Sequence, residues 1–168
     1  SEQVAQVDSK DMGYAVWRTL ALRCAAHLAR PEVAGIVVTH GTDTLEETAW
    51  FLQRVLAPGK PVVLVSAMRP ATALAPDGPQ NLLDGVLLAR APGVRGVLAV
   101  AAGQVHGARE VRKRHPYRLD AFGSGDAGPL ACIEEGRVRR FRDWPEGDAL
   151  GTDRLPQDTD DWPWVDIV

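Results

Sequence analysis

The sequence predicts an α/β fold, with a mostly parallel sheet, helices on both faces and a β-hairpin late in the chain. Three short apolar segments predict buried strands, at residues 35–39 (GIVVT), 61–67 (PVVLVSA) and 96–101 (GVLAVA). They lack the alternation of half-exposed strands, as expected for strands that are covered on both faces. Longer segments with helical periodicity separate them, and this alternation of strand and helix is typical of a parallel sheet between helices.

Three helices are predicted around these strands. From Asp11 to Arg30, apolar residues recur every four positions and form one stripe along a helix. Residues 45–56 have a similar apolar side, and the pair Pro58-Gly59 ends that helix. Asp77 is expected to cap the third helix, which has Pro79 in its first turn.

The later part of the chain changes character. Residues 129–141 contain two strand-like segments around a Glu-Glu-Gly turn and predict the hairpin. We assign residues 1–142 to a larger α/β domain that begins inside its fold, because no strand precedes the first helix. Residues 143–168 are acidic and rich in proline, which indicates a linker. Its last segment, residues 164–168 (WVDIV), is predicted to be the first strand of a further domain.

Composition restricts the classes of function. The chain has 168 residues, of which 45% are hydrophobic, enough for one domain with a core of its own. Its longest apolar segment is far too short to span a membrane, and a net charge of −3 gives no general attraction to nucleic acid. We therefore expect no membrane or nucleic-acid partner. The first residues do not form a signal peptide, which leaves the cytoplasm and the periplasm both open.

Residues 39–44 (THGTDT), which join the first strand to the second helix, are rich in side-chain oxygen. Residues 44–47 (TLEE) fit a capping box, in which a Thr hydroxyl and a Glu carboxylate bond the free amides of a helix start. Asp43 has a similar structural interpretation, as an acid in the field of the helix N-terminus. However, one capping residue suffices, and open α/β sheets bind their ligands at the carboxyl ends of their strands. Thr42 and Asp43 are therefore candidate site residues.

Four segments carry a resemblance to a known family. They are DSKDM (8–12), HGTDTLEETAWFL (40–52), SAMRPATALAPDGPQNLLDGVLLA (66–89) and GAREVRKRHPYRLDAFGSGDAGPLACI (107–133). In sequence, order and approximate spacing they resemble the bacterial-type L-asparaginases, the asparaginase/glutaminase family. The resemblance covers nearly the whole chain, as an N-terminal domain that lacks its first segment and the C-terminal domain.

The resemblance implies an amidohydrolase that needs neither a metal nor an organic cofactor. Family members hydrolyse the side-chain amide of asparagine, and some also that of glutamine, to the acid and ammonia by Thr-based nucleophilic catalysis. Carried over to this chain, Thr42 and Asp43 match the family's Thr-Asp pair, and Lys113 matches the lysine that pairs with the threonine. Asp43 would hold the substrate α-ammonium, and Ser9 would bind the α-carboxylate. Homotetramers built from close dimers are also implied.

Two departures from the family pattern bear on the site. Lys10 stands where the best-known members carry a substrate-contacting Gln, so it would place a cation among the substrate-binding residues. The family's other threonine, the usual nucleophile, would lie on a strand upstream of Ser1. Lys113 can act as a base only where its ammonium form is disfavoured, and burial is the expected cause. A non-catalytic amino-acid-binding or regulatory relative, using the pocket of Asp43 and Ser9, is the alternative.

Other motifs are assigned structural interpretations. Residues 123–128 match GxGxxG, but Pro129 and a strand follow, where a dinucleotide site requires a helix. The basic residues of segment 107–118 are expected to form a solvated loop. His40 and Arg69 are expected to support their loops.

Overall fold

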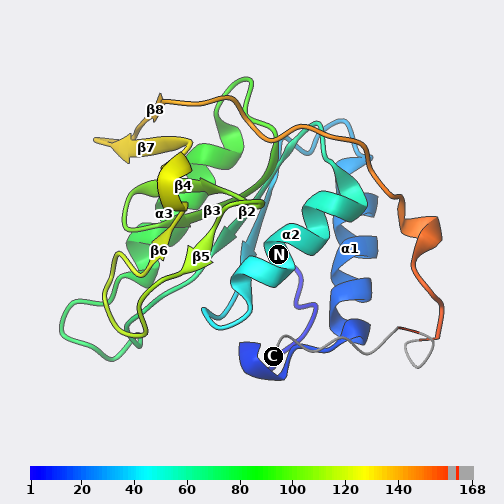
Figure 1. Ribbon diagram of the computed structural model, residues 1–168, viewed down its shortest axis with the longest axis horizontal. Helices are drawn as coiled ribbons and strands as arrows, with labels where there is room; N and C mark the ends of the chain where they lie inside the picture. Colours follow the sequence, from blue (N-terminus) through cyan, green and yellow to red (C-terminus); the bar gives the residue numbers. More distant parts are fainter. Residues whose placement is uncertain (159–161, 163–168) are drawn as a thin grey trace.

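The computed structural model describes residues 1–158 and 162 and contains a six-stranded sheet with helices on both faces (Figure 1). Its strands, in spatial order, are β1 (Ile36–Thr39), β2 (Pro61–Val65), β3 (Gly96–Ala101), β4 (Gln104–Gly107), β7 (Ala131–Glu134) and β8 (Arg137–Arg140). The first three are parallel to one another, and the others join antiparallel. The predicted α/β class is confirmed.

The helices divide between the two faces of the sheet. They are α1 (Tyr14–Leu28), α2 (Leu45–Leu56) and α3 (Gly78–Arg90). On β2, Val62 and Leu64 belong to the core cluster formed with α1 and α2, whereas Val63 and Val65 belong to the cluster formed with α3. All four side chains are buried, which explains why this strand shows no alternation in the sequence.

The predicted boundaries hold best where the sequence contains strong stop signals. The helix at 45–56 and the strand at 96–101 are found as predicted. The first helix begins later than expected, since Ser9–Asp11 forms a separate 3-10 turn (η1) and Gly13 is the N-cap residue of α1. The first strand begins at Ile36 instead of Gly35, and the second ends at Val65.

Two capping predictions are wrong in their chemistry. Thr44 is the N-cap residue of α2 but makes no side-chain cap bond, because its hydroxyl donates to the Ser9 carbonyl at 2.7 Å. The capping box is therefore absent. Asp77 is the N-cap residue of α3, but its carboxylate accepts the N–H groups of Met68 and Arg69, each at 2.9 Å. In both places the side-chain oxygen connects the helix end to another segment, which satisfies a donor or acceptor there.

The antiparallel part of the sheet contains one more strand than the sequence predicted. The predicted hairpin is confirmed as β7 and β8. Strand β4 was not predicted; it pairs with β3 through a two-residue turn of Ala102 (φ 50°) and Gly103 (φ 73°), the left-handed conformation that tight hairpins require. A separate two-stranded sheet consists of β5 (Arg112–Lys113) and β6 (Phe122–Gly123).

Residues 143–158, which we name the strap, leave β8 and run over the ends of α2 and α1 (orange in Figure 1). Trp144 at its start is buried in the core cluster of α3. Farther on, the N–H groups of Leu150 and Gly151 donate to carbonyls of α2, at 2.9 and 3.0 Å. The strand predicted at 164–168 lies outside the described residues, and the domain boundary at residue 142 stays a prediction. No helix in the described part of the chain could cross a membrane.

Candidate active site

The structure brings three predicted site residues together at the carboxyl end of β1. The Lys113 Nζ lies 2.7 Å from Thr42 Oγ1 and 2.6 Å from Asp43 Oδ1. The Lys113 side chain is 20% exposed and that of Asp43 is 50% exposed. An amine within hydrogen-bond distance of a hydroxyl is the geometry by which a base activates a nucleophile, and the exposed carboxylate can meet a cation.

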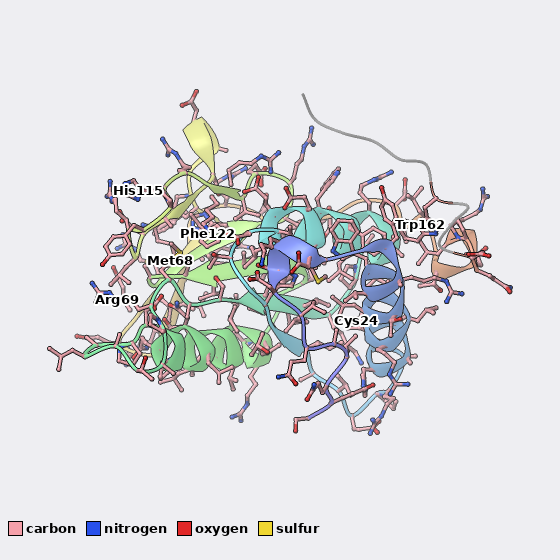
Figure 2. The ribbon with its side chains drawn as sticks, turned by 90° about the horizontal axis from the view of Figure 1, so that it is seen from below. Cys24, Met68, Arg69, His115, Phe122 and Trp162 are labelled. Atoms are coloured by element: carbon pink, nitrogen blue, oxygen red, sulfur yellow. The ribbon has the colours of Figure 1, made fainter. Side chains whose placement is uncertain are left out.

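Lys113 belongs to the small sheet of β5 and β6, and its side chain extends to Thr42 and Asp43, which we name the corner after β1. Val111 and Phe122 pack this hairpin of β5 and β6 against the core, because both are buried in the core cluster that α2 also lines. Figure 2 shows Phe122 toward the middle of the molecule and His115, beyond the end of β5, at its outer side. The neighbouring Arg112 bonds the Val111 carbonyl instead of the site, as the alternation of side chains along a strand predicts.

Ser9 lies directly against the same corner. Its Oγ accepts the N–H of Asp43 at 3.1 Å, and only 6% of the residue is exposed. This approach requires a glycine at position 41, since a Cβ on Gly41 would collide with Ser9 Oγ. Because Oγ is the acceptor from Asp43, the hydroxyl proton of Ser9 remains available to a ligand oxygen.

Lys10 turns toward acids of its own loop. Its Nζ lies 2.9 Å from Asp8 and 3.4 Å from Asp11, and its side chain is 63% exposed. The hydrogen bond that Lys10 donates to the Asp8 carboxylate raises the pKa of Lys10, with the charge of Asp11 as the next cause. The cation expected near the substrate is therefore partly neutralised by these two carboxylates.

His40 supports the corner through a chain of hydrogen bonds. Its Nδ1 is 2.7 Å from the Gly41 carbonyl, so this nitrogen donates, and Nε2 accepts from Thr48 Oγ1 at 2.9 Å. Trp17 Nε1 in turn donates to Thr48 Oγ1 at 2.8 Å. Burial lowers the pKa of His40, which favours the neutral ring that this bonding pattern needs. The structural role predicted for His40 agrees with these contacts.

Sequence reasoning missed one residue beside the site, Glu46 in the first turn of α2. Its Oε2 accepts the backbone N–H of Lys113 at 2.5 Å, and its Oε1 lies 3.8 Å from Arg112 Nε. An acid near a helix start has an ordinary explanation in the helix field, so nothing in the sequence marks Glu46 as a site residue. Arg69 supports its loop as expected, by donating to the Ala75 carbonyl at 3.2 Å.

The glycine-rich segment lacks the context of a dinucleotide site. Only the three-residue 3-10 turn η2 (Gly125–Ala127) follows β6, and no α-helix begins there. Ser124 instead bonds the buried His106, with 2.8 Å between Oγ and Nδ1. Among residues 1–158 and 162, no three His, Cys, Asp or Glu side chains are grouped to hold a metal ion.

Comparison with known proteins agrees with the fold and the motifs. Residues 1–146 match the family model of the asparaginase N-terminal domain. The chain is 42% identical to L-asparaginase 2 of Escherichia coli (strain K12), over 82% of this chain and 39% of that protein. It is 38% identical to L-asparaginase 2 of Bacillus subtilis (strain 168), over 99% of this chain and 45% of that protein.

A solved structure shows the same fold. The crystal structure of a probable cytoplasmic L-asparaginase from Campylobacter jejuni superposes with a TM-score of 0.81 at 43% identity, covering 84% of this chain and 46% of that one. A glutaminase-asparaginase of Pseudomonas fluorescens biotype A is 40% identical, over 84% of this chain and 39% of that protein. The chain thus spans less than half the length of these relatives. Together, these similarities show that the chain belongs to the asparaginase family and corresponds to its N-terminal domain.

Proposed function

We propose that the full-length protein hydrolyses the side-chain amide of L-asparagine to aspartate and ammonia. The observation that carries this proposal is the contact of Lys113 Nζ with both Thr42 Oγ1 and Asp43 Oδ1, from segments about 70 residues apart. The similarity to proteins named L-asparaginase supports the choice of substrate. L-glutamine is a second candidate substrate, because a relative at 40% identity is named for both activities.

The proposed reaction assigns proton transfer to Lys113 and Thr42. Lys113 accepts the Thr42 proton, and the Thr42 oxygen then withdraws a proton from the attacking group. The resemblance implies that this group is a threonine of an upstream segment. Its oxygen bonds the amide carbon, ammonia leaves with a proton returned through the same pair, and water hydrolyses the resulting ester.

Asp43 and Ser9 are the proposed anchors for the two charged groups of the substrate. The half-exposed Asp43 carboxylate pairs with the α-ammonium, and the free hydroxyl proton of Ser9 is donated to the α-carboxylate. Lys10 stands nearby on the Ser9 loop and adjusts the local charge. The proposed assembly is a homotetramer or homodimer, which sedimentation of the full-length protein measures.

Ammonia release by the full-length protein tests the proposal. Wild-type protein should release ammonia from L-asparagine, and Thr42→Ala should abolish most of this activity. Thr19→Ala, at an exposed position on α1, is the matched control and should retain it. Binding of asparagine without ammonia release would support a non-catalytic amino-acid-binding relative instead. Activity of Thr42→Ala equal to that of Thr19→Ala would remove Thr42 from the site.

A further inference from the structure

Glu46 has no part in the proposed proton transfer, yet it holds the strand that carries Lys113. Its carboxylate accepts the Lys113 N–H at 2.5 Å, between residues 67 positions apart. We propose that Glu46 is a positioning residue, which sets where the Lys113 Nζ stands relative to Thr42 and Asp43. This inference rests on the proposed function of Lys113.

The strand that carries Lys113 needs an anchor outside its own hairpin. Strands β5 and β6 have two residues each and stand apart from the main sheet, and an isolated two-stranded hairpin is marginally stable. The N–H of Arg114 donates to the Ala121 carbonyl across the hairpin at 2.7 Å. Because N–H directions alternate along a strand, the N–H of Lys113 points away from β6. This outward N–H donates to the Glu46 carboxylate.

A carboxylate suits this position on physical grounds. A hydrogen bond to a charged acceptor is shorter and about twice as strong as one between neutral groups. The Glu46 side chain is only 23% exposed, so solvent weakens the bond little, and its second oxygen faces Arg112. Glu46 also lies in the first turn of α2, where a negative charge is favourable.

The anchor closes a ring of contacts around the site. Thr42 and Asp43 lie immediately before α2, and Glu46 lies in the first turn of that same helix. The helix end therefore holds Thr42 and Asp43 through the chain and the backbone of Lys113 through Glu46. The Lys113 side chain then spans back to Thr42 and Asp43. Both sides of the proton-transfer pair are thus fixed to one rigid element.

Burial of the hairpin does not replace this anchor. Val111 and Phe122 hold the hairpin against the core, but their apolar side chains have no acceptor for the outward N–H of Lys113. Without the Glu46 carboxylate, β5 keeps its apolar packing through Val111 but loses the hydrogen bond that fixes its distance from α2. A displacement of about 1 Å at a proton-transfer pair is enough to reduce turnover about 100-fold.

The test compares four variants of the full-length protein: Glu46→Ala, Glu46→Gln, Glu47→Ala and Glu46→Ala with Lys113→Met. Glu47 is the matched control, because it is the neighbouring acid in the same first turn. Glu46→Ala should lower kcat about 10- to 100-fold with little change in KM, and Glu46→Gln, which keeps an acceptor oxygen, should lose less. Glu47→Ala should stay within about twofold of wild type. In the Lys113→Met background, Glu46→Ala should cause no further loss.

Hydrogen–deuterium exchange of the peptide that contains Lys113 gives a readout that is independent of activity. This peptide should exchange faster in Glu46→Ala and at the wild-type rate in Glu47→Ala. Equal exchange and equal kcat in these two variants would overturn the proposal, as would a further loss in the Lys113→Met background. If wild type releases no ammonia, or Lys113→Met retains turnover, the proposed function fails instead, and the exchange comparison alone decides the role of Glu46.

Discussion

Lys113 and Asp43 share one short contact but have opposite requirements in the proposed reaction. Lys113 has to accept a proton, whereas Asp43 has to keep its charge to hold a cationic group. Their exposed fractions, 20% and 50%, fit this division, because the half-buried amine also contacts the Thr42 hydroxyl, and the more exposed carboxylate is open to a ligand. Substitutions at the two positions should therefore change different kinetic constants.

Lys113→Met in the full-length protein is expected to lower kcat for asparagine about 10²- to 10⁴-fold, the usual contribution of a general base. KM should change little, because the substitution removes a proton acceptor and no anchor. Lys113→Arg should be almost as damaging, since a guanidinium does not lose its proton near neutral pH. Arg114→Met serves as the control. Near-normal turnover of either Lys113 variant would contradict the assignment.

Asp43→Asn is expected to act on binding. Loss of a charged hydrogen bond costs about 1.5–3 kcal/mol, which corresponds to a rise in the Kd for asparagine of about 10- to 150-fold. Succinamic acid, which is asparagine without its α-amino group, should lose much less affinity. Titration of wild type and variant with both compounds measures the difference. Equal losses for the two compounds would leave Asp43 a helix-terminal acid only.

His106 predicts a pH dependence of stability. Burial lowers its pKa from the ordinary 6.5 to about 4. Between pH 6.5 and pH 4, His106 is therefore protonated in the unfolded chain and neutral in the folded protein. The free energy of unfolding is therefore unaffected by this group above pH 6.5 and falls as the pH is lowered through the window. Between pH 7 and 5 the loss is about 2 kcal/mol from His106. Urea unfolding of the full-length protein should show it, and His106→Gln should remove that part of the slope.

Among the secondary-structure elements, β1 stands out as a sheet edge. Of the described strands only β2 pairs with it, and a hollow of about 1120 Å³ lies beside it, lined by β1, α1 and residues 1–7. The N–H of His40 donates to the Val65 carbonyl of β2. By alternation, the N–H of Val38 also points to β2, and that of Val37 points outward into the unpaired edge.

The 168-residue chain, made alone, is expected to associate through this edge, since unpaired strand edges recruit other strands. Val37→Pro removes an outward N–H and should reduce the association seen by analytical ultracentrifugation. Val38→Pro removes an N–H that bonds β2 and should instead unfold the chain, which circular dichroism detects. An unchanged size distribution for Val37→Pro would show that the association uses another surface.

Predictability from sequence followed the length of each element and the range of its contacts. The helix at 45–56 was predictable because its apolar side and Pro58-Gly59 are local signals. Strands β4, β5 and β6 are too short for a pattern, and pairing with distant segments defines them. In the site, strand topology and resemblance indicated Thr42 and Asp43. The contact between Glu46 and the Lys113 backbone depends on a fold that local sequence does not encode.

For the molecule as a whole, the 168-residue chain alone is expected to release no ammonia from asparagine above background. The resemblance implies that the attacking threonine and a neighbouring subunit complete the site. In the proposed reaction, this chain supplies the proton-transfer pair and the anchors. An ammonia assay on the purified chain, with the full-length protein as the positive control, measures this. Robust hydrolysis by the chain would make Thr42 itself the attacking group.

The attachment of the strap to α2 has a mechanical consequence. Leu150 and Gly151 bond carbonyls in the last turn of the helix whose first turn adjoins Thr42 and Asp43. A force applied to the chain beyond residue 158 would break these two hydrogen bonds one after the other. The hydrogen bonds between the parallel strands would instead share a shearing force and resist it together. In a single-molecule force experiment the strap should therefore detach from α2 at low force. This step should lengthen the extended chain before the sheet unfolds. Until the strap detaches, α2 acts as a stiff rod of about 18 Å between the pulled end and the segment of Thr42 and Asp43.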